Sequence, residues 1–113
     1  MLLHLHDKDV AHTKNGSLKF EGELYNFPTS FFLIADQPGN PGPPLHKHPY
    51  AEAWVVRSGS AKFTAGEAQF DAVAGDILVV EAETPHKYHN SGDSVLELVC
   101  IHPSPRMIQT NLE

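Results

Sequence analysis

Three histidines and one glutamate occupy positions from which they could bind a metal ion. His46, His48 and Glu52 lie in one short segment, and His86 follows far downstream. The first three share a parity, so on an extended backbone their side chains project from one face. Two imidazoles and a carboxylate on one face can hold a divalent ion, and an imidazole from a neighbouring strand would complete the set. The chain has eight histidines, some of them ordinary surface residues, but this pattern predicts a metal site.

The ligand set also limits which metal would bind and what it would do. Three neutral imidazoles and one carboxylate suit Fe, Mn, Ni, Co or Zn, and they disfavour Ca and Mg, which prefer oxygen ligands. The set lacks the thiolates that commonly hold structural zinc. Open coordination positions favour Lewis-acid chemistry, or oxygen chemistry for a redox-active ion. A purely structural ion is the alternative.

The elements that must position these ligands are predicted to be strands. Short apolar runs recur throughout the chain, separated by clusters of Gly, Pro, Asn and Asp, which is typical of strands joined by tight turns. The predicted strands cover residues 18–25, 31–35, 51–58, 61–65, 67–73, 77–80, 86–90 and 95–102.

The segments between these strands show no helical periodicity. Residues 37–44 are rich in Pro and Gly and predict a stiff surface loop that leads directly into His46. Residues 107–113 could form at most one helical turn. Roughly eight to ten short strands favour a closed all-β architecture, because closure removes exposed sheet edges. We expect residues 1–113 to form one domain around a barrel able to hold one small ligand.

Composition excludes several classes of partner. The net charge is −6 with only eight Lys and Arg, so binding to a nucleic-acid backbone lacks its electrostatic basis. No stretch approaches the length of a membrane span, and the N-terminus lacks the positive region of a signal peptide. Cys100 is the single cysteine and has apolar neighbours, which predicts a buried, inert thiol. A cytoplasmic location is the expectation.

With these residues identified, the chain resembles the cupins, small barrels of the jelly-roll group. The first cupin motif ends in HxH, three or four residues, Glu, six residues and Gly, and His46, His48, Glu52 and Gly59 fill every position. The second motif has Gly, five residues, Pro-x-Gly, two residues, His, three residues and Asn. Its outer positions are matched in register by Gly75, His86 and Asn90. The resemblance implies a double-stranded β-helix, or jelly-roll barrel, with motif 1 at about 40–59 and motif 2 at about 75–90.

The chain departs from the second motif at its inner positions. Glu81 and Glu83 stand where the family has Pro and Gly, and both are expected on the barrel rim. A glutamate tolerates positive φ less readily than glycine does, and Thr84-Pro85 could therefore move the bend by one residue. Because His86 and Asn90 keep their spacing, the ligand position is expected to survive.

Other conspicuous residues have simpler interpretations. Trp54 shares the face of Glu52 and is expected to fill the core, whereas Tyr88 shares the face of His86 and is a weak catalytic candidate because its hydroxyl could reach a metal-bound group. Asn90 is expected to satisfy backbone groups of its turn. The remaining histidines are expected outside the cavity: His4, His6 and His12 exposed or in a dimer contact, His89 facing outward, and His102 at the end of the last strand.

Three functions are compatible with these residues. The first is a metal-dependent enzyme acting on a small oxygenated metabolite, with dioxygenation ahead of decarboxylation and isomerisation. The second is a non-catalytic barrel that binds a carbohydrate or a small acid. The third is a dimerisation role, in which Leu2, Leu3 and Leu5 could contribute to a shared sheet, and it can coexist with either of the others. We expect a homodimer with a small-molecule ligand, and no self-contained DNA-binding regulator.

Overall fold

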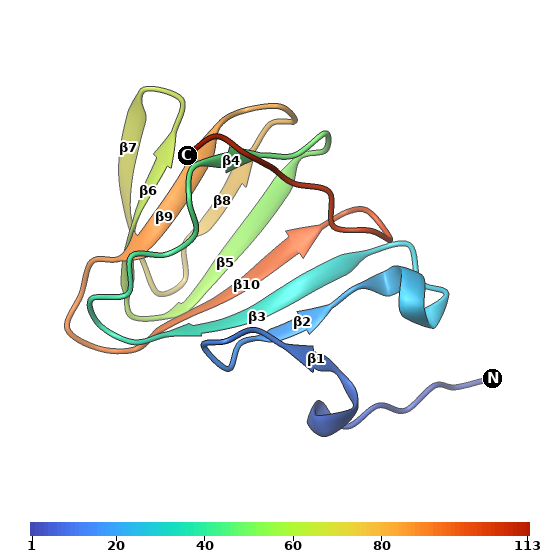
Figure 1. Cartoon of the computed structure of the whole chain (residues 1–113). Helices are drawn as coiled ribbons and strands as arrows, with labels where there is room; N and C mark the ends of the chain where they lie inside the picture. Colours follow the sequence, from blue (N-terminus) through green and yellow to red (C-terminus); the bar gives the residue numbers. More distant parts are fainter.

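The computed structural model describes residues 1–113 as two antiparallel sheets facing one another (Figure 1). The larger sheet has the order β1-β2-β3-β10-β5-β8, and the smaller has the order β11-β4-β9-β6-β7. The strands of the larger sheet are β1 (Ala11–His12), β2 (Leu18–Phe20), β3 (Ser30–Asp36), β5 (Glu52–Ser58), β8 (Ile77–Val80) and β10 (Leu96–His102). Those of the smaller sheet are β4 (His46–Lys47), β6 (Ser60–Ala65), β7 (Ala68–Val73), β9 (His86–Asn90) and β11 (Thr110–Asn111).

Burial alternates along the central strands, as expected when one face of each sheet covers the core. Along β10, Leu96, Leu98 and Cys100 are buried while Glu97 and Ile101 are exposed. The predicted jelly-roll architecture of packed antiparallel sheets is therefore confirmed, and Cys100 is a buried thiol, with a pKa raised by that burial.

One local prediction was wrong. The first predicted strand stops at Phe20, and Gly22–Tyr25 forms a 3₁₀ helix. Gly22 lies against backbone there, since a Cβ on it would stand 2.2 Å from the carbonyl oxygen of Phe27, so the chain bends where a strand would continue. The only other helical segment is a 3₁₀ turn at Asp7–Asp9, and no helix is long and apolar enough to cross a membrane.

The C-terminal tail, in which at most one helical turn was expected, contains a short strand instead. Strand β11 pairs with β4, with Asn111 opposite His46, and Figure 1 shows the tail running beside β4. The Leu112 amide donates to the Leu45 carbonyl at 2.8 Å, and the Leu45 amide donates to the Glu113 carboxylate at 2.8 Å. The tail thereby fixes the segment that carries the first two histidines.

The turn before His86 keeps its position despite the two glutamates. Glu83 adopts φ +66°, and the Thr84 amide closes the turn by donating to the Glu81 carbonyl at 3.3 Å. A positive φ at the third residue of such a turn is the conformation that normally selects glycine. Glu83 is held there because its amide donates to the His48 carbonyl at 2.7 Å and its carboxylate pairs with Lys47 at 3.2 Å. Both glutamates are exposed, as predicted for a rim.

We predict that Glu83→Gly raises the free energy of unfolding by about 0.5–1 kcal/mol. The left-handed conformation costs a residue with a Cβ about 1–2 kcal/mol, and the larger backbone entropy that glycine loses on folding offsets part of this gain. Glu83→Ala keeps the strained backbone and removes the exposed ion pair, so it should not stabilise. Urea unfolding of the three proteins measures the difference. Equal stability of Glu83→Gly and Glu83→Ala would show that the backbone conformation is not the source of strain.

Candidate metal centre

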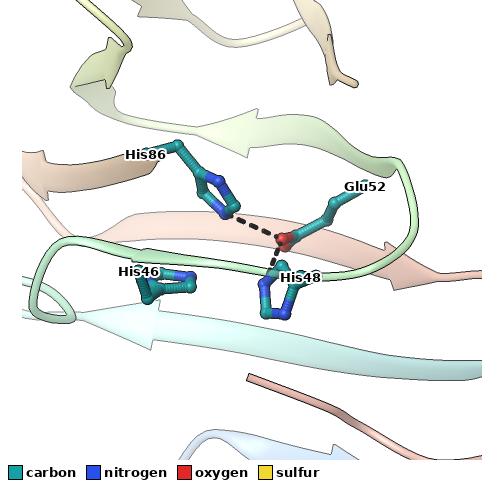
Figure 2. Close-up of side chains that lie close together, drawn as sticks. All are labelled: His46, His48, Glu52 and His86. Atoms are coloured by element: carbon teal, nitrogen blue, oxygen red, sulfur yellow. Dashed lines mark hydrogen bonds and ion pairs between the residues drawn. The ribbon is translucent and has the colours of Figure 1, made fainter. Parts of the chain in front are cut away.

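The structure brings the four predicted ligands together from three strands of the two sheets. His46 on β4 pairs across the smaller sheet with His86 on β9, His48 follows β4, and Glu52 begins β5 of the larger sheet. One ligand atom from each of the four lies within 4.8 Å of the others, and all four residues are buried. Figure 2 shows His48 and His86 directed at the carboxylate of Glu52, with His46 beside them.

Each of these three imidazoles has its Nδ1 next to a backbone carbonyl oxygen. The Nδ1 atoms of His46, His48 and His86 lie 2.6, 2.7 and 2.8 Å from the carbonyls of Pro44, Ile108 and Thr84, respectively. A carbonyl oxygen can only accept, so Nδ1 carries the proton in each ring. The neutral ring then has a lone pair on Nε2, which is the tautomer that ligates metals, held by the kind of outer hydrogen bond found at metal sites.

The Nε2 lone pairs meet the carboxylate of Glu52. Its Oε1 lies 3.0 Å from Nε2 of His48 and 3.2 Å from Nε2 of His86. His48 Nε2 is buried with no hydrogen bond of acceptable geometry, despite the short contact. With neutral rings, this arrangement sets lone pairs against a carboxylate oxygen, which is unfavourable unless a cation lies between them. The donor set and the unpartnered nitrogen therefore fit a divalent metal. Without a cation at this position, the rings of His48 and His86 would have to be protonated on both nitrogens to avoid the repulsion.

Burial and hydrogen bonding act in opposite directions on the ionisable groups. Burial alone would raise the pKa of Glu52, but the imidazoles of His102, His48 and His86 beside it outweigh burial and hold that pKa far below its ordinary value. Burial lowers the pKa of His46. Burial also opposes protonation of His48, but the adjacent Glu52 carboxylate and the hydrogen bond to the Ile108 carbonyl together raise its pKa. Glu52 is therefore ionised in this site, as a metal ligand must be.

The prediction that His102 lies outside the cavity was wrong. His102 is 3 % exposed, lines the cavity, and places Nε2 at 3.3 Å from Oε2 of Glu52. The missed signal was the period of two along β10, since His102 shares the parity of Cys100, already predicted to be buried.

His102 differs from the other three imidazoles in its Nδ1 partner, which is the hydroxyl of Tyr50 at 2.6 Å. A hydroxyl can donate, and the Tyr50 oxygen itself accepts from the Ile108 amide at 3.3 Å. His102 can therefore accept at Nδ1 and donate its Nε2–H to Glu52. His102 thus occupies Oε2 of Glu52, and the other oxygen, Oε1, faces the Nε2 atoms of His48 and His86. Burial raises the pKa of Tyr50 to about 12, which keeps its hydroxyl protonated as a donor.

A cavity of about 310 Å³ adjoins this centre, and His46, Glu52 and His102 form part of its wall. Trp54 and Tyr88 line it as well, and both are buried among the core residues. The Trp54 ring also packs at 5.2 Å from both Phe63 and His86, in line with core filling. Burial raises the pKa of Tyr88 well above its usual value, so its hydroxyl is protonated. The site thus combines a ligand-sized space with four convergent donor groups.

The remaining predicted roles agree with the structure. Asn90 donates to the carbonyls of Asp36 and Ser94 and accepts from the Gly92 amide, so it satisfies backbone groups as expected. The histidines predicted to be outside the cavity, apart from His102, are all exposed: His4, His6, His12 and His89.

Comparison with known proteins assigns the family. The sequence profile described as Cupin domain matches residues 32–102. This chain belongs to the cupin family. An uncharacterized protein of Methanocaldococcus jannaschii is 31% identical over 62 residues, which are 54% of this chain and 50% of that protein. The cupin chain therefore spans about half the length of this curated relative.

Solved structures with the same fold are cupin-type oxalate decarboxylases. The Lactobacillus farciminis oxalate decarboxylase in complex with formate has a TM-score of 0.80 at 23% identity, covering 95% of this chain and 35% of that one. The Bacillus subtilis oxalate decarboxylase, described with Mn(II) centres, has a TM-score of 0.76 at 23% identity, covering 91% and 29%. This chain spans about a third of their length, and likeness at this identity shows the shared fold alone.

We predict that His102→Ala weakens metal binding by about tenfold to a hundredfold, because Glu52 loses the donor that fixes its second oxygen. Tyr50→Phe should weaken it less, since His102 remains but its Nδ1 loses a donor. Competition with a chromophoric chelator measures both affinities. The matched control is His89→Ala, which removes an exposed histidine and should leave affinity unchanged. Wild-type affinity in His102→Ala would rule out the positioning role.

Proposed function

We propose that this cupin is a metal-dependent enzyme that acts on a small oxygenated metabolite. The observation that carries the proposal is the set of three imidazole Nε2 lone pairs facing an ionised, buried carboxylate at the wall of a ligand-sized cavity. His46, His48, Glu52 and His86 would hold the ion. When bound, it would supply Lewis-acid chemistry or, if redox-active, oxygen chemistry.

Among possible reactions we place dioxygenation first, followed by decarboxylation and isomerisation. A substrate with adjacent oxygen donors, such as an enediol, a 2-hydroxy acid or a diketone, would chelate the ion beside Trp54 and Tyr88. Decarboxylation is favoured by the named activity of the structural relatives and by the Mn(II) centres of one of them. Tyr88 is the side chain we propose to touch the substrate, because its protonated hydroxyl belongs to the cavity wall.

The alternative proposal is a non-catalytic barrel that binds a carbohydrate or a small acid. It is supported by the lack of a clearly poised general base outside the proposed ligand shell: the other carboxylate on the cavity wall, Asp36, lies at the far end of β3. In either function we propose one domain over residues 1–113. A cytoplasmic location is also proposed, which the single buried thiol of Cys100 supports.

We predict that protein purified without added metal contains one equivalent of a transition metal, and that His86→Ala loses it. His89→Ala, on the same strand but exposed, should retain it. Elemental analysis gives metal identity, and an oxygen electrode with an enediol, a 2-hydroxy acid and a diketone gives the reaction class.

Iron with oxygen uptake would support dioxygenation, whereas manganese or nickel without uptake but with product would support decarboxylation or isomerisation. Metal and ligand binding without any turnover would support the binding barrel. Absence of metal together with unchanged ligand binding in His86→Ala would defeat the proposal.

A homodimer is the assembly we propose, formed through the outer face of the larger sheet. Strand register places apolar side chains in two rows on this face, and two of the most exposed are Ile77 and Val79, at 70% and 71%. Arg57 and Glu97 are exposed at the end of the same face, so a two-fold contact could pair the arginine of one copy with the glutamate of the other. The rows are Leu33, Val99, Val55 and Ile77, and Phe31, Ile101, Ala53 and Val79.

We predict that the protein is a dimer in light scattering after size-exclusion chromatography, and that Val79→Lys makes it a monomer by burying a charge in the contact. Val73→Lys is the matched control, because Val73 is 56% exposed on the other sheet and should leave the dimer intact. The exposed Leu2 and Leu3 could extend the contact, which a variant with both changed to serine would weaken. A monomeric wild-type protein would refute this assembly.

A further inference from the structure

We propose that the cavity takes an elongated, uncharged molecule with adjacent oxygen donors at one end and a hydroxyl or N–H donor at the other. The adjacent oxygens would face the metal centre, and the distal donor would reach Asp36. This inference rests on the proposed function, since it names the class of ligand that the same site would accept.

The length of the ligand follows from the two ends of the cavity. Phe32 and Asp36 both line it from β3, and the Phe32 ring packs 5.7 Å from that of His102 beside Glu52. Asp36 stands four residues farther along the strand, which is about 13 Å at the usual rise per residue. The metal centre and the Asp36 carboxylate therefore occupy different ends of one space of about 310 Å³.

Between these ends the wall is largely apolar or aromatic. Ile34, Trp54 and Cys100 line it from the larger sheet, and Tyr88 lines it from the smaller one. Cys100, Trp54 and Tyr88 are all buried core residues. A flat or apolar middle section of the ligand would match this wall, because most of the exposed wall surface there is apolar or aromatic.

The charge of the ligand follows from the charged side chains on the wall. Asp36 and Glu52 are both acidic, and no Lys or Arg lines the cavity. A divalent ion offset by two carboxylates leaves a site with no net charge. A dicarboxylate such as oxalate, the substrate named for the structural relatives, would bring two uncompensated charges against a wall that holds two carboxylates and no Lys or Arg, at a large electrostatic and desolvation cost. An uncharged chelating molecule has no such cost.

Asp36 supplies the distal acceptor. It is 4% exposed, and burial raises the pKa of its carboxyl above the ordinary value, a shift that a hydrogen bond with the Asn15 side chain offsets only in part. Thr13, Asn15 and Asn40 surround that end with uncharged polar groups. A buried carboxylate with one side-chain partner retains free acceptor positions, and a donor on the ligand can fill one of them.

The test compares two probes that differ by one hydroxyl. The first is 3,4-dihydroxybiphenyl, a catechol with an apolar extension, and the second is 3,4,4′-trihydroxybiphenyl, which adds a donor at the far end. Oxalate is the dianionic probe. Binding to the Co(II)-loaded protein under nitrogen is measured by calorimetry and by the visible Co(II) spectrum. The variants are Asp36→Ala and, as the control for loss of one negative charge, Asp71→Ala, whose side chain is 80% exposed on β7.

We expect the trihydroxy probe to bind the wild-type protein about tenfold more tightly than the dihydroxy probe, as a hydrogen bond to a carboxylate would give. Asp36→Ala should reduce that ratio to about one and should strengthen oxalate binding several-fold, because a negative charge is removed. Asp71→Ala should behave as wild type.

Two results would overturn the inference while leaving the proposed function intact. In one, Co(II) binds, as its spectrum reports, but the two biphenyl probes bind the wild-type protein equally. In the other, oxalate binds the wild-type protein as tightly as the trihydroxy probe. The wild-type comparison does not depend on how well Asp36→Ala folds. If no Co(II) binds, the proposed function fails, and the inference fails with it.

Discussion

The buried carboxylate of Glu52 is the interaction on which the rest of this structure depends. It is 4% exposed and lies within 3.3 Å of three imidazole nitrogens, those of His48, His86 and His102. An isolated charge in such a position would be prohibitively costly. Two of those nitrogens cannot serve as neutral donors, because the protons of their rings are committed to backbone carbonyls. A cation beside Glu52 would resolve this conflict, so the electrostatics of the folded chain support the proposed metal site.

The backbone around the site is built to keep those protons on Nδ1. The carbonyls of Pro44 and Thr84 lie two residues before the histidines that they orient. Two of the three hydrogen bonds from Nδ1 to a carbonyl are therefore formed within a single turn. The third is different, because Ile108 belongs to the C-terminal tail, 60 residues from His48. The same residue donates its amide to Tyr50, which in turn contacts His102. One tail segment thus orients a proposed metal ligand and the side chain that supports Glu52.

The inner and outer faces of the sheets have different roles. The proposed metal site lies between the inner faces, and the proposed dimer contact lies on the outer face of the larger sheet. The inner faces hold the core and the cavity, whose polar groups gather at its two ends. The outer face of the larger sheet carries two apolar rows, in which Leu33, Ile77, Val79 and Ile101 are exposed and the other members are half-buried. Because alternate residues of one strand serve the two faces, β10 lines the cavity through Cys100 and His102 while Val99 and Ile101 contribute to the outer rows.

The sequence by itself determined the family, the class of fold and the four convergent donors. HxHxxxE and the later histidine keep the spacing of the family motifs. The alternation of side chains between the two faces of a strand depends only on sequence position, so it can be read directly from the sequence. Even the turn at Glu83 keeps its place without the usual glycine, because its amide and its carboxylate both have partners in the segment from Lys47 to His48.

Tertiary structure alone decided what surrounds those donors. The pairing of the tail with β4, the donor chain from Tyr50 through His102 and the position of Asp36 at the far end of the cavity join residues distant in sequence. No local pattern encodes such contacts, since each depends on which strands become neighbours. The 3₁₀ helix at Gly22–Tyr25 was missed for a related reason, because backbone packed against Gly22 bends a segment whose side-chain pattern suits a strand. Spacing specified the four convergent donors, and the packing of the sheets and the tail set their tautomers, their charge and the space beside them.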